Sequence, residues 1–228
     1  MLTPFEIEAL WLSLKVATWA VLWILPLGLA VAWLLARCRF PGKSLVDGLV
    51  HLPLVIPPVV IGYLLLVALG RNGIVGAWLH EHLGLTLVFT WRGAAVAAGV
   101  MAFPLMVRTI RLSLESMDRR LETAARTLGA RPFDVFLTVT LPLISPGIVA
   151  GVILSFARCL GEFGATITFA SNVPGETRTL PLAIYSALQT PGGEAAVTRL
   201  AVIAVVVAVI ALAASEILAR RLARRIEA

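Results

Sequence analysis

The sequence of 228 residues contains little charge. Asp, Glu, Lys and Arg make up 14% of it, whereas hydrophobic residues make up 59%, and the mean hydropathy is +0.94. A water-soluble domain contains about 25% charged and about 45–50% apolar residues, and its interior cannot hide this much apolar side chain. The 13 prolines and 18 glycines are scattered rather than repeated, which excludes collagen-like and low-complexity chains. The composition indicates an integral membrane protein.

Residues arranged for chemistry are also scarce. Cys38 and Cys159 lack the spacing of a disulfide framework or a zinc site. The fragment nearest to a phosphate-binding loop, residues 42–44, has Arg37 where the first glycine is needed. The three histidines do not pair within the membrane, and no G-x-S-x-G or H-E-x-x-H occurs. We therefore expect no catalysis, metal or cofactor on this chain, and an energy source in a partner or an ion gradient.

Five apolar stretches are long enough to cross a bilayer, which takes about 20 residues of helix. Two shorter apolar runs, residues 163–170 and 180–188, cover less than half of a bilayer and predict a re-entrant or short outer segment. The sequence thus predicts an all-α membrane protein, a single domain of residues 1–228 with five transmembrane helices. These helices are expected at residues 9–36, 49–69, 94–112, 141–160 and 197–218.

The basic residues are distributed unevenly between the loops. The loops after the first and third spans and the C-terminal tail together carry 13 Lys and Arg residues, whereas the loops on the opposite side carry three. Cytoplasmic loops are the ones enriched in Lys and Arg. The count predicts an N-terminus outside the cell and a C-terminus in the cytoplasm, and it explains the net charge of +6 without a nucleic-acid partner.

The cytoplasmic loop between the third and fourth spans carries its own helix signals. Asp118 suits an N-cap and Gly129 suits the left-handed position that ends a helix, so a short helix is predicted between them. Pro132 suits the first turn of a second helix. An apolar stripe on that helix fits either an interfacial helix on the inner leaflet or a helix docked in a groove of a cytosolic partner. The stripe consists of Phe133, Phe136 and Leu137.

The same loop resembles a known motif. Ala124-Ala125, then Gly129, and after nine intervening residues Val139-x-Leu141-Pro142 are similar to the EAA loop of ABC-transporter permeases of the importer class. Thr123 occupies the Glu position of that pattern, with Glu122 one residue earlier. The resemblance implies that residues 113–140 contain the coupling helix that docks on an ATP-binding subunit. The residues assigned to coupling are Glu122, Thr123, Ala124, Ala125, Gly129, Phe133, Phe136, Leu141 and Pro142.

Longer blocks extend the resemblance over nearly the whole chain. Residues 51–66, 91–94, 124–130, 161–169 and 174–179 are similar to the molybdate permease subfamily of these transporters, and tungstate and sulfate permeases share several of the blocks. The resemblance implies the membrane-spanning permease subunit of an ATP-driven molybdate importer in a bacterial inner membrane, with tungstate or sulfate/thiosulfate as alternative substrates.

The partners follow from the same resemblance. It implies a homodimer, two cytosolic ATPase subunits that hold ATP and Mg²⁺, and an extracytoplasmic oxyanion-binding protein, without a nucleic-acid partner. The alternative from another class is an ion-coupled secondary transporter that works alone. Such proteins usually show inverted repeats and charges near the membrane midplane, and neither is evident in this sequence.

Several residues within or beside the spans suggest a translocation path or gate. Pro57-Pro58 interrupts the second span and must kink or break it, either as a broken helix lining a cavity or as a packing kink. Arg158 and Glu162 are four residues apart and can neutralise each other, although Arg158 could instead meet an oxyanion. The residues assigned to the path or gate are Pro57, Pro58, Arg158, Glu162, Phe163 and Thr166.

Overall fold

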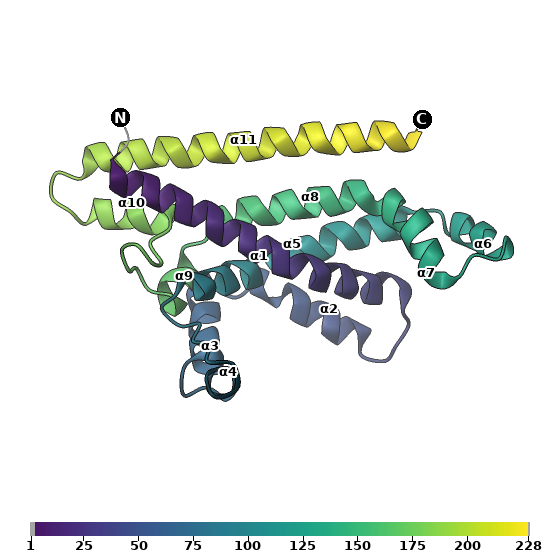
Figure 1. The fold of residues 1–228 in the computed structure, drawn as a ribbon, viewed down its shortest axis with the longest axis horizontal. Helices are drawn as coiled ribbons and strands as arrows, with labels where there is room; N and C mark the ends of the chain where they lie inside the picture. Colours follow the sequence, from purple (N-terminus) through teal and green to yellow (C-terminus); the bar gives the residue numbers. More distant parts are fainter. Residues whose placement is uncertain (1–2, 228) are drawn as a thin grey trace.

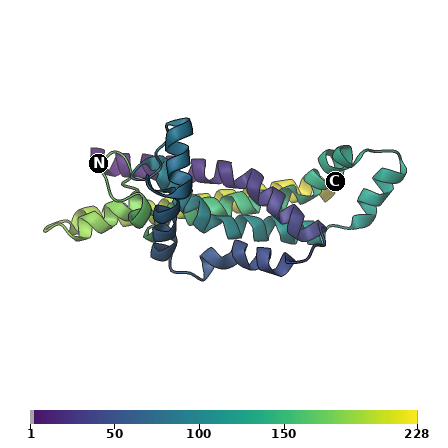
Figure 2. The ribbon, with the colours of Figure 1, turned by 90° about the horizontal axis from the view of Figure 1, so that it is seen from below.

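The structure is a computed structural model that describes the backbone of residues 3–227 and the side chains of residues 3–214 and Ile217. Four long helices lie side by side along its longest axis (Figures 1 and 2). They are α1 (Pro4–Arg37), α5 (Trp91–Ser116), α8 (Leu141–Leu160) and α11 (Glu194–Glu227). All four are long and apolar enough to cross a membrane, and residues 3–227 contain no strand. The all-α membrane fold and four of its predicted spans are confirmed.

The N-terminal turn of α1 is capped and then held against other elements. Thr3 and Glu6 form a capping box, in which each side chain accepts a hydrogen bond from the other residue's backbone N–H. Glu6 is buried, and its carboxylate also pairs with Arg199 of α11 at 2.8 Å. The hydroxyl of Ser13 accepts a hydrogen bond from the backbone N–H of Leu180. These contacts join the start of α1 to α11 and to the segment that begins at Leu180.

Helix α5 occupies the centre of the bundle because small residues let its neighbours approach closely. Ala94, Ala98 and Ala102 are at most 1% exposed. A Cβ atom at Gly99 would lie 2.5 Å from Cζ2 of Trp23, so only glycine leaves room for that indole. The result is a densely packed contact of α5 with α1 and α8.

The second predicted span, residues 49–69, is not one continuous helix. Helix α2 (Lys43–His51) and a 3₁₀ turn (Leu52–Leu54) precede the break, and α3 (Pro58–Leu69) leaves at 112° to them. Proline lacks the N–H that a helix needs and disfavours helical geometry in the residue before it. The kink or break predicted at Pro57-Pro58 is confirmed, and it takes the form of a broken helix. The chain has four spanning helices, or five if the bent pair counts as one crossing, among the residues searched.

Three short helices lie toward the end of the bundle that holds the start of α1 (Figure 1). They are α4 (Ile74–Leu83), α9 (Gly164–Phe169) and α10 (Leu180–Leu188). Helix α9 packs against α3 and α5, and α10 packs against α1 and α11. Helices α9 and α10 are the two short apolar runs, residues 163–170 and 180–188, and the prediction that neither crosses the membrane is confirmed. We call this end of the bundle the far end.

The opposite end carries α6 (Arg119–Thr127), and we call it the loop end. Helix α7 (Pro132–Val135) continues through a π-helical turn (Phe136–Thr140) into α8. The segment predicted as the coupling loop, residues 113–140, thus contains the last residues of α5, α6 and the short helix predicted to begin at Pro132, which continues without interruption into α8. The π turn has a local cause: Pro142 cannot donate to the carbonyl of Thr138 and crowds it, and a wider turn with Leu141 N–H bonded to Phe136 C=O relieves this crowding.

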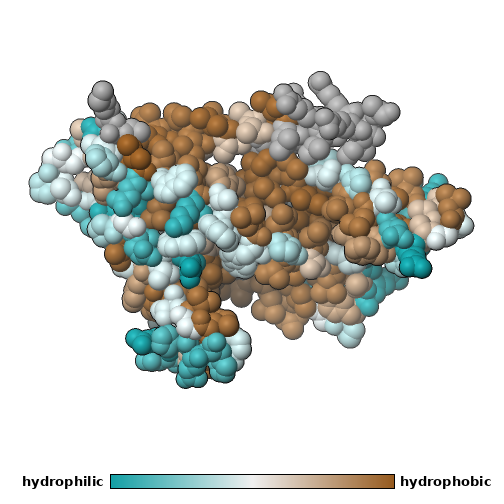
Figure 3. All heavy atoms as spheres, viewed as in Figure 1, coloured by the Kyte–Doolittle hydropathy of each residue, from teal (hydrophilic) through white to brown (hydrophobic). Residues whose placement is uncertain are grey.

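The molecular surface is apolar in the middle and polar toward the two ends. Figure 3 shows hydrophobic residues across the middle of the face in view, with hydrophilic residues gathered on α4 and toward the two ends. Such an apolar band between polar ends is what a multi-pass membrane protein presents to a bilayer.

Candidate functional site

Helix α6 has the boundaries that its cap residues predict. The Asp118 carboxylate accepts a hydrogen bond from the backbone N–H of Arg120 at 2.9 Å. At the other end Gly129 has φ +89°, and the N–H of Ala130 reaches back to the C=O of Ala125 at 3.2 Å. This left-handed closure is typical of a helix end with glycine just beyond it. The helix is therefore a defined element at the tip of the loop end.

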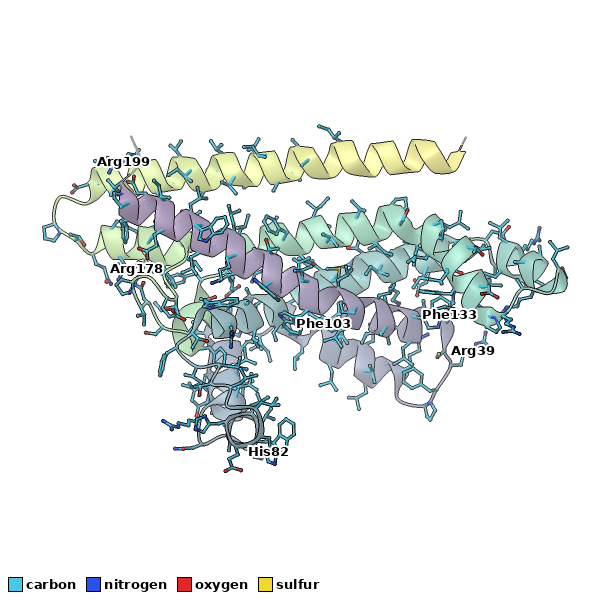
Figure 4. The ribbon with its side chains drawn as sticks, in the orientation of Figure 1. Arg39, His82, Phe103, Phe133, Arg178 and Arg199 are labelled. Atoms are coloured by element: carbon cyan, nitrogen blue, oxygen red, sulfur yellow. The ribbon has the colours of Figure 1, made fainter. Side chains whose placement is uncertain are left out.

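Three large apolar side chains at this tip face outward. Leu128 is 88% exposed, Phe133 is 69% exposed and Leu121 is 48% exposed. Of these, only Phe133 is among the predicted coupling residues; Leu128 is marked in the sequence only as an apolar residue directly before the helix-ending Gly129. Of the other predicted coupling residues, Thr123, Ala124, Gly129 and Pro142 are exposed, whereas Ala125, Phe136 and Leu141 are half-buried. The side chain of Phe133 is labelled at this end of the molecule in Figure 4.

Glu122 lies against the bundle rather than on the outer surface. Its Oε1 atom accepts hydrogen bonds from Nη2 of Arg37 at 3.0 Å and from the hydroxyl of Thr140 at 2.8 Å. The side chains of Arg37 and Glu122 are only 10% and 12% exposed. Beside them Phe136 packs edge-on against Trp33 with 5.3 Å between ring centroids. Two predicted coupling residues, Glu122 and Phe136, thus attach the loop end to the last turns of α1.

The predicted pairing of Arg158 with Glu162 is confirmed. Nη1 of Arg158 lies 2.6 Å from Oε2 of Glu162, whose side chain is 2% exposed. The other carboxylate oxygen accepts the backbone N–H of Ala165 at 2.8 Å, within the first turn of α9. A buried carboxylate with both a cation and a backbone donor is fully satisfied. Glu162 therefore fixes the start of α9 relative to the end of α8.

The other predicted path residues gather around α9. Pro58 begins α3 and lies against Gly164, where an added Cβ would approach its Cβ to 2.8 Å. Phe163 packs against Tyr185 of α10 with 5.2 Å between ring centroids, and Thr166 is buried. Pro57 precedes α3 at the bend. The structure thus brings the six predicted path residues to one junction of α3, α8 and α9 near the far end.

Substituting Gly62 with valine is expected to destabilise this junction. A Cβ at Gly62 would lie 2.7 Å from the backbone carbonyl oxygen of Ala165, which cannot move without shifting α9. Overpacking of this kind typically lowers the free energy of unfolding by about 1–3 kcal/mol. The thermal unfolding midpoint in detergent measures the effect, with Gly48→Val as the matched control, since nothing lies within 4 Å of a Cβ there. Equal midpoints for the two variants would contradict the close crossing of α3 and α9.

The comparisons with known proteins agree on one family. The family described as binding-protein-dependent transport system inner membrane component matches residues 24–226. The chain is 60% identical over 220 residues to the molybdenum transport system permease protein ModB of Escherichia coli K12, with 96% of each chain covered. It is 44% identical over 162 residues to the sulfate transport system permease protein CysT of the same organism, over 71% of this chain and 58% of that protein.

A solved structure shares the fold. The bacterial alginate ABC transporter in complex with alginate pentasaccharide-bound periplasmic protein matches with a TM-score of 0.76 at 19% identity, over 96% of this chain and 80% of that chain. The likeness covers nearly the whole chain and shows that the two proteins share a fold. The chain belongs to the family of binding-protein-dependent transport system inner membrane components, the multi-pass inner-membrane permeases of ABC importers.

Proposed function

We propose that this chain is the permease through which an ABC importer delivers molybdate to the cytoplasm. The observation that carries the proposal is the 60% identity, over 96% of both chains, to a molybdenum transport system permease. Sulfate is the second candidate substrate, because a sulfate transport permease is 44% identical over a shorter stretch. Tungstate shares the tetrahedral oxyanion chemistry and remains an arm of the test. Family membership removes the stand-alone secondary transporter from consideration.

The loop end is proposed to receive the ATPase subunits. The exposed apolar side chains of Leu121 on α6, Leu128 directly after it and Phe133 on α7 form a docking surface at the tip of the loop end. An amphipathic helix of this kind fits a groove of a partner. In this proposal ATP and Mg²⁺ are held by the partner and hydrolysis occurs there. The predicted coupling residues then divide into those that contact the ATPase, such as Leu128 and Phe133, and those that attach the loop to α1, such as Glu122.

Two copies of the chain are proposed to form the translocation path between them. The centre of the single bundle is closed, since Ala98, Ala102 and Ile110 are at most 1% exposed. Large apolar faces remain uncovered on α3, including Val59, and on α11. A second copy would cover part of these faces, and the junction of α3, α8 and α9, with Arg158 at its rim, would then lie beside the path.

The orientation is proposed from the charges. The basic residues that precede α2 and surround α6 lie at the loop end, and cytoplasmic segments carry such an excess. The arginines of the C-terminal tail, which were also counted in predicting the orientation, lie outside the residues whose side chains the structure describes. In this proposal the loop end lies in the cytoplasm with the ATPase, and the far end lies outside, where a binding protein delivers the oxyanion.

ATP hydrolysis by the complex tests the proposed function. The chain is purified from its native membranes with its associated subunits, reconstituted in liposomes, and supplied with the cognate binding protein loaded with molybdate, tungstate or sulfate, or left empty. Molybdate-loaded protein is expected to stimulate hydrolysis and uptake above the empty protein. Stimulation by sulfate alone would reassign the substrate, and the absence of any associated ATPase would overturn the importer mechanism.

A further inference from the structure

Two cations at the far end share one indole ring. Nζ of Lys15 lies 3.8 Å from the ring centroid of Trp91, and the guanidinium carbon of Arg92 lies 5.6 Å from the same centroid. Among the described residues neither cation has a carboxylate within 4.0 Å, although five other basic groups do. An unpaired cation near the apolar zone of a membrane is unfavourable unless an anion or water reaches it. The pair therefore marks a place where negative charge is accommodated.

An apolar groove leads away from these cations. Trp19, Trp23, Leu87 and Arg92 line a cavity of about 430 Å³ beside Trp91. Trp23 also lines a second cavity of about 390 Å³ between α1, α2 and α5, whose other walls include Val50 and Phe103. Figure 4 shows Phe103 in the space between α1 and α2. We call the two cavities together the α1–α2 groove; it is cationic at one end and almost wholly apolar toward the middle of the bundle.

A suitable occupant of the groove carries a negative charge at one end and an apolar chain along the rest. A free oxyanion could meet the cations but would leave the apolar walls uncovered. A second copy of this chain offers only uncharged residues or arginine along its exposed faces on α3 and residues 195–214 of α11, so these faces supply no anion. A phospholipid with a net negative headgroup supplies a phosphate at the membrane interface and an acyl chain below it, and basic pockets between transmembrane helices bind such headgroups.

We propose that the α1–α2 groove is a binding site for an anionic phospholipid. Lys15 and Arg92 hold the phosphate, and one acyl chain runs past Trp23 toward Phe103. The lipid comes from the bilayer leaflet at the far end, and the proposal does not depend on which oxyanion is transported. The lipid would fill the space between α1 and the broken second span, so its binding is expected to stabilise α2 against α1 and α5.

Lipid retention by the purified complex tests the site. The complex is delipidated in detergent and titrated with dioleoylphosphatidylglycerol or dioleoylphosphatidylethanolamine, with bound lipid counted by native mass spectrometry and the thermal unfolding midpoint recorded in parallel. The anionic lipid is expected to be retained and to raise the midpoint, whereas the zwitterionic lipid is retained less. Lys15→Gln and Arg92→Gln are each expected to weaken retention about five-fold, as one lost cation–headgroup contact does.

Matched variants separate the site from general charge effects. Arg71→Gln removes a cation from the same end outside the groove and is expected to leave retention unchanged. Val50→Trp fills the apolar cavity without a change in charge and is expected to exclude the acyl chain. Equal retention of both lipids, loss of retention in Arg71→Gln equal to that in Arg92→Gln, or a midpoint rise produced by inorganic phosphate or molybdate alone would each overturn the lipid site.

Discussion

Replacing Leu128 with aspartate is expected to separate the ATPase from this permease. Leu128 is 88% exposed at the end of α6, directly before Gly129, whose φ of +89° ends the helix. Burial of a leucine in a partner groove contributes about 1.5–3 kcal/mol, and a carboxylate in the same groove would also be desolvated without a partner. Truncating a central interface residue of this kind weakens binding by ~2 kcal/mol or more, which raises the dissociation constant about 30-fold.

The measurement is the amount of ATPase that co-purifies with the variant, together with ATP-driven uptake. Both are expected to fall sharply, while the thermal unfolding midpoint of the permease itself stays near that of the wild type, because so exposed a side chain contributes little to its own fold. Leu83→Asp is the control: Leu83 is also an exposed leucine, 56% accessible, at the end of α4 away from the loop end. Normal ATPase retention by the Leu128 variant would show that α6 does not dock through this residue.

Local sequence signals predicted the helix ends well because each end depends on residues adjacent to it. Asp118 and Gly129 bound α6 as predicted, since a cap needs only a side-chain oxygen or a left-handed glycine next to the helix. Helix α8 has its predicted limits for the same kind of reason, with Gly161 following it. The prolines at 57 and 58 predicted a break, but its angle of 112° depends on how α3 packs against α9, which local sequence does not encode.

The sequence predicted less about the contacts of the site residues. Glu122 and Arg37 are 85 residues apart, and nothing near either residue indicates that they meet. The family pattern implied that Glu122 acts in coupling, and the structure adds that this side chain of α6 is nearly buried against Arg37 of α1. The spacing of apolar residues also does not predict which of them are exposed. Phe133 and Phe136 belong to one predicted stripe, yet Phe133 faces outward and Phe136 packs on Trp33.

Exchanging the charges of Arg37 and Glu122 is the second change with a large expected effect. Arg37→Glu alone would put two carboxylates where a 3.0 Å ion pair now lies, at a site only 10–12% exposed. Loss of one partner of a largely buried pair destabilises the local structure by about 3 kcal/mol or more. Helix α6 would then detach from α1 while Leu128 and Phe133 stay available to the ATPase. We expect hydrolysis to continue and uptake per ATP to fall towards zero.

The double variant Arg37→Glu with Glu122→Arg restores opposite charges and is expected to recover most of the uptake, because the hydroxyl of Thr140, which now donates to Glu122, can accept a hydrogen bond from an arginine instead. Arg39→Glu makes the same charge change two residues away at an exposed position and should leave uptake per ATP unaltered. Recovery in the double variant measures the coupling energy between the two sites directly. If Glu122 instead contacted the ATPase, its substitution would reduce ATPase retention and Arg37→Glu would not rescue it. The charge exchange therefore distinguishes a residue that attaches α6 to α1 from one that binds the partner.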